Sequence, residues 1–192
     1  MPRAISAGRP LTWASVRELD GSATAVETLC RGAVPPALRL TAYAAHVVRR
    51  VSPGGIGPDR HQRQRTPLTW YAPASALLAA FPRRVATAGE RQAVLDQLDH
   101  CLHRLADGTL RVRLPRPEAD PLPTGARGLT LYHRPAPAIP LFTVDRGDRV
   151  TLVPDSSLRT ARDLLERARL HAYDPLVAAR LLADRRTRLP RP

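Results

Sequence analysis

The chain has 192 residues, of which 30 are basic and 17 acidic, giving a formal net charge of +13. This length suits one domain or two small ones. No uncharged apolar run approaches the ~20 residues that a membrane span needs, and the first residues lack the apolar region of a secretory signal, so we expect no membrane association and a cytoplasmic protein.

Every basic residue is arginine, and the chain contains neither lysine nor asparagine. Arginine grips phosphate well because its planar guanidinium group donates two parallel hydrogen bonds. A GC-rich genome would give the same bias, since Lys and Asn have A/T-rich codons. Codon usage does not explain the net charge, which is therefore the strongest functional indication in the sequence.

The first third of the chain predicts an arm and two helices. Residues 1–21 show no clear period and read as an arm. Thr24 and Glu27 have capping-box spacing and predict a short helix through Cys30. The prolines and the apolar spacing of 36–51 predict a second helix.

The rest of the chain alternates helical and strand-like patterns. Thr87 and Glu90 form a second capping box before the best-patterned helix of the chain, and turn residues between two β-rich runs at 141–153 predict a hairpin. The other predicted elements are a strand at 68–71, a helix at 75–81, strands at 109–114 and 128–134, a helix from Asp155 and a last helix at 175–182.

This order predicts an α+β fold, with helices flanking a small antiparallel β-rich middle and a winged-helix-like core. We expect three segments. They are an N-terminal arm with a short helix (1–35), a winged-helix-like domain (36–134), and a β-hairpin followed by two C-terminal helices (135–192).

The winged-helix expectation rests on element order in about a third of the chain. The matching pieces are ALLAAF (76–81), TAGERQAVLDQLDHCLHRLADG (87–108), TLRVRL (109–114) and GLTLYHR (128–134). This order resembles the winged helix-turn-helix superfamily. The resemblance implies a supporting helix, a recognition helix for the major groove and a wing that touches the DNA backbone or minor groove.

Charges give evidence for and against this resemblance. Arg111 and Arg113 alternate with apolar residues, which gives the predicted wing one basic face. The predicted recognition helix, however, carries Asp96 and Asp99, and residues 67–110 have no net charge. An ordinary core helix with a solvated charged face is the competing interpretation.

The leading hypothesis is a nucleic-acid-binding protein that grips phosphates, with duplex DNA as the expected partner. Residues 36–66 hold six arginines against one acid, although a solvated arginine-rich loop explains 59–65 equally well. The candidate nucleic-acid-binding residues are Arg60, Arg63, Arg65, Arg83, Arg84, Arg91, Arg111, Arg113, Arg116 and Arg127.

No motif of an enzyme or of a metal or cofactor site is present. The sequence lacks a GxSxG elbow, a Walker loop and a GxGxxG turn. His100 and His103 lack further ligands at metal-binding spacing, and we expect Cys30 and Cys101 to be buried free thiols. We therefore expect no enzyme activity, metal or cofactor.

The alternative function is an accessory subunit that docks on an acidic partner protein, which would show an apolar surface patch near the termini.

Overall fold

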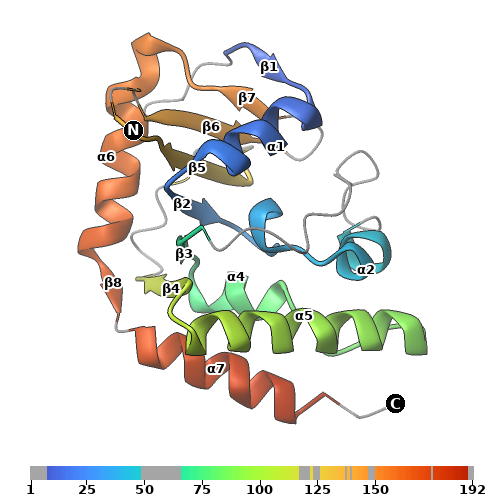
Figure 1. Cartoon of the computed structure of the whole chain (residues 1–192). Coiled ribbons are helices and arrows are strands. Elements are labelled where there is room, and N and C mark those ends of the chain that lie inside the picture. Colours follow the sequence, from blue (N-terminus) through green and yellow to red (C-terminus); the bar gives the residue numbers. More distant parts are fainter. Residues whose placement is uncertain are drawn as a thin grey trace.

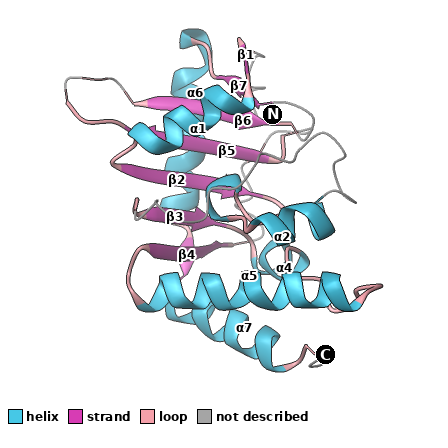
Figure 2. Cartoon of the chain, turned by 45° about the vertical axis from the view of Figure 1, so that its right-hand side comes forward, coloured by secondary structure: helices cyan, strands magenta, loops and turns pink. Residues whose placement is uncertain are grey.

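A mixed sheet runs through the whole molecule and carries helices on both of its faces (Figures 1 and 2). The computed structural model describes residues 8–48, 66–116, 122, 126–136, 138, 140–146, 150–173 and 175–189. The strands are β1 (Pro10–Leu11), β2 (Ala25–Cys30), β3 (Leu68–Tyr71), β4 (Leu110–Pro115), β5 (Gly128–His133), β6 (Leu141–Asp145), β7 (Val150–Leu152) and β8 (Ala172–Tyr173).

The helices lie in the connections between these strands, except for α7, which follows the last strand. They are α1 (Trp13–Ser22), the 3-10 turn η1 (Pro36–Leu38), α2 (Thr41–Tyr43), the π-helix η2 (Ala44–Val48), α4 (Ala74–Ala79), α5 (Ala88–Ala106), α6 (Asp155–Leu170) and α7 (Pro175–Thr187). Among the described helices, none is both long and apolar enough to cross a membrane.

The strand order is β1-β7-β6-β5-β2-β3-β4-β8. β2, β3 and β4 are mutually parallel, and every other neighbouring pair is antiparallel. The long connections from β2 to β3 and from β3 to β4 permit this parallel pairing, because parallel neighbours need a crossover and cannot be joined by a tight turn. The expected mixture of helices and strands is confirmed, but the expectation of a small antiparallel middle is wrong.

The strands predicted to form a wing are not neighbours. β4 and β5 belong to the same sheet, but β2 and β3 lie between them. They therefore make no hairpin, and β4 pairs instead with β3 and β8. The expected domain boundaries, after residues 35 and 134, both fall between strands of this same sheet.

Two hydrophobic clusters hold the helices to the sheet. One lies between the sheet and α4, α5 and α7, and it includes Trp70, Phe81 and Leu98. The other lies under α6 and includes Leu29 and Phe142. We call the first side the α5 face and the second the α6 face.

The largest local error concerns 25–30, which forms the central strand β2 instead of a helix. Val26, Cys30 and Leu29 are buried on the two faces of the sheet, as suits a strand with neighbours on both sides. The expected arm contains α1, and the helix expected at 36–51 is broken within its described part into η1, α2 and η2. Extended backbone at Leu40 separates η1 from α2.

The remaining local predictions are confirmed. The capping box of Thr87 and Glu90 opens α5, with both of its reciprocal hydrogen bonds present. β6 and β7 form the expected antiparallel pair, and α6 and α7 cover the two predicted C-terminal helices. Both cysteines are buried free thiols.

Candidate functional site

The candidate arginines do not gather on one side of the described structure. Arg111 and Arg113 follow the register of Thr69 and Tyr71 and project from the α6 face of β4. Their neighbours Leu110 and Val112 pack on the α5 face. Arg83 and Arg84 are exposed in the connection between α4 and α5, two helices that cover that opposite face.

The other candidate arginines are scattered further. Arg91 is half-buried on α5. Arg116 is exposed beside the end of α6, where its backbone N–H donates to the carbonyl of His171 at 3.2 Å. Arg127 is exposed just before β5. Arg60, Arg63 and Arg65 lie outside the described residues.

Several other arginines have structural roles that the sequence did not reveal. Arg104 is buried, and its guanidinium group donates to the carbonyl oxygens of Thr66 and Thr109 and to the Thr109 hydroxyl. It thereby joins the end of α5 to the entries of β3 and β4. Arg186 forms a two-pronged ion pair with Asp99 that ties α7 to α5.

A polar cluster on the α6 face is centred on Glu27. Its carboxylate accepts two hydrogen bonds from Arg169, at 3.0 and 2.5 Å. It also lies 2.7 Å from His133 Nε2 and accepts a 2.9 Å hydrogen bond from the Tyr71 hydroxyl. Glu166, one turn before Arg169 on α6, binds the same guanidinium group at 2.9 Å. The cluster therefore joins three sheet strands to the last turn of α6.

Electrostatics favour the charged form of Glu27 and the neutral form of Tyr71 in this cluster. Burial opposes the charge on Glu27, but hydrogen bonds from Arg169 and His133 outweigh it and lower the pKa of the carboxyl. Burial, together with the neighbouring Glu27, raises the pKa of Tyr71 to about 12. Glu27 is thus a carboxylate whose oxygens are already engaged by four hydrogen-bond donors. Such a group is suited to clamping α6 onto the sheet and poorly suited to act as a general base.

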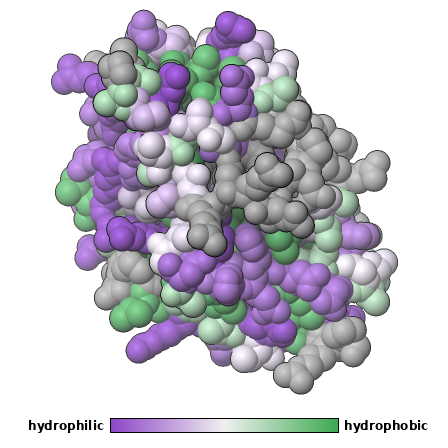
Figure 3. Space-filling model, viewed as in Figure 1, coloured by the Kyte–Doolittle hydropathy of each residue, from purple (hydrophilic) through white to green (hydrophobic). Residues whose placement is uncertain are grey.

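Next to this clamp, the chain exposes large apolar side chains where α6 passes through β8 into α7. Leu170 is 71% exposed, Leu176 is 65% exposed and Val177 is 43% exposed. Figure 3 shows hydrophobic atoms over α6 and the start of α7, among hydrophilic neighbours, with further hydrophobic atoms elsewhere on this face. Single exposed apolar side chains are common, but two leucines and a valine within eight residues of one junction call for an explanation.

Two exposed arginines flank this patch. Arg167 precedes Leu170 by three positions on α6, and Arg180 follows Leu176 and Val177 by four and three positions on α7. Residues at these spacings are neighbours on a helix surface. Neither arginine has an ion-pair partner among the described residues. We call the set Arg167, Leu170, Leu176, Val177 and Arg180 the α6–α7 corner.

Comparison with known proteins gives a family without an assigned activity. No curated protein and no solved structure matches the chain. Within the described residues, no three His, Cys, Asp or Glu side chains come together as a metal site would require. The profile of the family described as a domain of unknown function, DUF5753, matches residues 13–184, so the chain belongs to this family.

Proposed function

We propose that this protein is a non-enzymatic docking module that binds an acidic partner protein through the α6–α7 corner. The observation that carries the proposal is the pair of largely exposed leucines, Leu170 and Leu176, beside Val177 and two exposed arginines. Apolar residues rimmed by charge are typical of protein interfaces.

Burial of the apolar residues would supply most of the affinity. A fully buried Leu or Val side chain contributes about 1.5–3 kcal/mol relative to exposure. Leu170 and Leu176 still have most of this stabilisation to gain, since they are 71% and 65% exposed in the isolated chain. Arg167 and Arg180 would add specificity and a faster encounter with a negatively charged surface, in keeping with the net charge of +13.

The Glu27 cluster supports this use of the corner. It ties Arg169, the residue directly before Leu170, to the sheet through two hydrogen bonds. A patch held on a rigid element loses less conformational entropy on binding than a patch on a loose helix end. The corner is therefore preorganised for docking.

Docking on a protein is favoured over nucleic-acid binding by the distribution of the described arginines. A phosphate footprint needs arginines on one continuous surface, whereas Arg111 and Arg113 project from the α6 face and Arg83 and Arg84 follow a helix of the α5 face. Exposed leucines contribute nothing to phosphate binding. Nucleic acid is therefore an alternative outcome of the test.

The test compares three probes by fluorescence anisotropy at low and high salt. The probes are a helical peptide of glutamates and leucines, its counterpart with lysines, and a short DNA duplex. We expect the acidic peptide to bind the wild type, and the triple variant L170S/L176S/V177S to weaken this binding by at least about tenfold, which is about 1.4 kcal/mol. The lysine peptide should not bind.

A matched pair of charge variants separates the corner from general attraction to a basic protein. R167Q/R180Q removes two arginines from the corner, and R83Q/R84Q removes two exposed arginines elsewhere. Only the first should weaken binding of the acidic peptide. Equal losses would refute the corner as the docking site. Tighter binding of DNA than of the acidic peptide, unaffected by the serine variant, would replace docking with nucleic-acid binding.

A further inference from the structure

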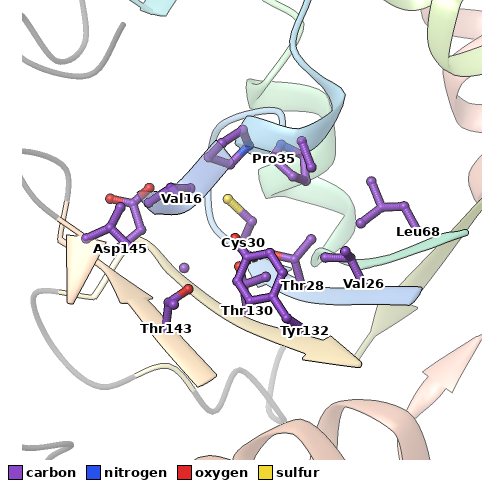
Figure 4. A pocket seen from close by; sticks show the side chains of 14 residues that line it. Val16, Val26, Thr28, Cys30, Pro35, Leu68, Thr130, Tyr132, Thr143 and Asp145 are labelled. Carbon is purple, nitrogen blue, oxygen red and sulfur yellow. Dashed lines mark hydrogen bonds between the residues drawn. The ribbon is translucent and has the colours of Figure 1, made fainter. Parts of the chain in front are cut away.

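The hollow over the middle of the sheet is too small for an organic ligand. It lies between the sheet, Val16 of α1 and the segment Pro35–Ala37 (Figure 4). Its cavity volume is about 20 Å³, which is room for about one water molecule. A stronger candidate for ligand binding is a group of arginines at the surface between α4 and α7.

Arg185 occupies a position of α7 that an apolar residue would normally take. Ala178 and Leu182 of α7, and Leu189 just beyond its end, are buried in the hydrophobic cluster of the α5 face. Arg185 continues this stripe at helical spacing and is only 9% exposed. Burial of a charged group is costly unless an opposite charge or several hydrogen bonds compensate it, so this arginine calls for an explanation.

The described residues compensate the charge of Arg185 only in part. α4 and α7 pack against each other (Figure 2), and Nη2 of Arg185 donates a 2.6 Å hydrogen bond to the carbonyl of Leu78 near the end of α4. Its Nε is buried and has no hydrogen-bond partner in the described part of the chain, which also provides no carboxylate at ion-pair distance. Most N–H groups of this guanidinium are therefore unused by the described chain.

Two further arginines are near enough to act electrostatically on Arg185. Arg83 lies in the exposed connection between α4 and α5, and Arg188 is exposed just after α7, three positions beyond Arg185. Burial, together with repulsion from Arg83 and Arg188, lowers the pKa of the Arg185 guanidinium. We call Arg83, Arg185 and Arg188 the arginine cluster. Asp184 is the acid that the described residues place beside it, at 2.9 Å from Arg188.

The arginine cluster has more positive charge than the fold requires. Its three positive charges and the one negative charge of Asp184 leave +2. A cation at the C-terminal end of α4 is favourable, and Arg185 alone supplies it. Arg83 and Arg188 oppose the charge of Arg185, so in the isolated chain they destabilise this arrangement. An anion bound among the three would remove that repulsion.

From this arrangement we infer that the arginine cluster binds phosphate, either as the free ion or as a monoester of a small molecule. A phosphate monoester carries a charge of about −1.5 to −2 at neutral pH, which matches the excess charge of the cluster. Its oxygens can accept hydrogen bonds from several guanidinium groups at once. A carboxylate carries a single charge and suits the cluster less well. None of these arginines belongs to the α6–α7 corner, so the inference is independent of the docking proposal.

Variants of the two exposed arginines test this site without disturbing the core. R83Q and R188Q each remove one charge from the cluster and leave the buried Arg185 in place. The matched control is R159Q, which removes an exposed arginine from α6 on the opposite face of the sheet and lowers the net charge by the same amount. A second control is L170S/L176S/V177S, which alters the docking corner and should bind phosphate like the wild type.

The measurement is isothermal titration calorimetry of the full chain with inorganic phosphate and with glucose 6-phosphate, accompanied by thermal unfolding. We expect both probes to bind the wild type and to raise Tm, since a ligand that binds only the folded chain stabilises it. R83Q/R188Q should weaken binding by at least about tenfold, which is about 1.4 kcal/mol. In phosphate-free buffer R83Q should not lower Tm, because it removes a repulsion, whereas loss of a structural contact would lower it.

Other outcomes would overturn the inference. Absence of binding by both phosphate probes refutes the site, and equal binding by R83Q/R188Q and the wild type refutes its location. An equal loss in R159Q would mean general attraction to a basic protein. Acetate and a short DNA duplex are the competing anions. Tighter binding of acetate than of phosphate refutes the match to a doubly charged ion. DNA binding that R83Q/R188Q abolishes and R159Q keeps, and that is tighter than phosphate binding, would replace the small ligand with nucleic acid.

Discussion

The Glu27 cluster allows a prediction of stability to be worked from distances and exposure. The substitution E27Q keeps the shape of the side chain but removes the charge that faces Arg169, His133 and Tyr71. Removing one partner of a fully buried ion pair costs about 3–5 kcal/mol. Here the Glu27 side chain is 13% exposed and that of Arg169 is 36% exposed, so solvent and Glu166 recover part of the loss. We expect E27Q to lower the free energy of unfolding by about 2–3 kcal/mol.

The assay is urea denaturation of E27Q, R169Q and the double variant, which together form a double-mutant cycle. The coupling free energy between the two positions should be about 2 kcal/mol. For a chain of this size the single variants should lower Tm by about 5–10 °C. Exposed surface ion pairs have coupling free energies of about 0.2–1 kcal/mol. A value in that range would refute the role of Glu27 in clamping α6 onto the sheet, because Glu27 and Arg169 would then contribute no more than an ordinary surface contact.

The pH dependence of this variant is a second readout of the same contact. The pKa of Glu27 is lowered in the folded chain from its ordinary value of 4.5. Its contribution to stability is therefore fully present above about 4.5 and is lost as the pH falls through the folded pKa. The difference in unfolding free energy between the wild type and E27Q should stay constant near neutral pH and shrink in acid. A difference that grows in acid would contradict this sign.

Three further predictions concern α5. Leu98 is fully buried, so L98A should lower the unfolding free energy by about 2–5 kcal/mol, and a loss under about 1 kcal/mol in urea denaturation would contradict its place in the core. The buried Gln97 accepts a 2.7 Å hydrogen bond from the backbone N–H of Leu40, so Q97L should cost about 1–3 kcal/mol and speed hydrogen exchange at the Leu40 amide. R104K should destabilise the chain by about 1–3 kcal/mol because lysine cannot reproduce the three hydrogen bonds of this guanidinium group. R111K, at an exposed position of β4, is its control in thermal unfolding and should change Tm little.

The sequence predicted best those features that depend on a few neighbouring residues. The capping box of Thr87 and Glu90 acts over three positions, and it forms as expected. Turn residues and β-rich runs sufficed for the β6–β7 pair. The same capping-box spacing at Thr24 and Glu27 was misleading, because Glu27 lies in a strand and binds residues 44, 106 and 142 positions away. The spacing of Thr and Glu alone does not distinguish these two cases.

The order of the strands could not be predicted from the sequence for a similar reason. A strand, a loop and a second strand read as a hairpin, yet the positions on both sides of β4 are taken by β3 and β8. Pairing depends on which apolar faces can be buried together over the whole sheet. Thr28 of β2 lies in register with Thr130 of β5 and Thr143 of β6, and no local pattern of the sequence indicated this row. The alignment of the row needed the register of three strands.

Composition and structure give different information about the function of the arginines. A net charge of +13 indicates an anionic partner, but it cannot separate arginines that hold the fold together from those that face a partner. Arg104 and Arg169 are engaged by backbone carbonyls and by Glu27. Arg167 and Arg180 stand exposed beside the leucines of the α6–α7 corner. Charge that lies next to exposed apolar surface favours a protein partner, because phosphate groups gain nothing from contact with leucine. The docking proposal depends on this contrast.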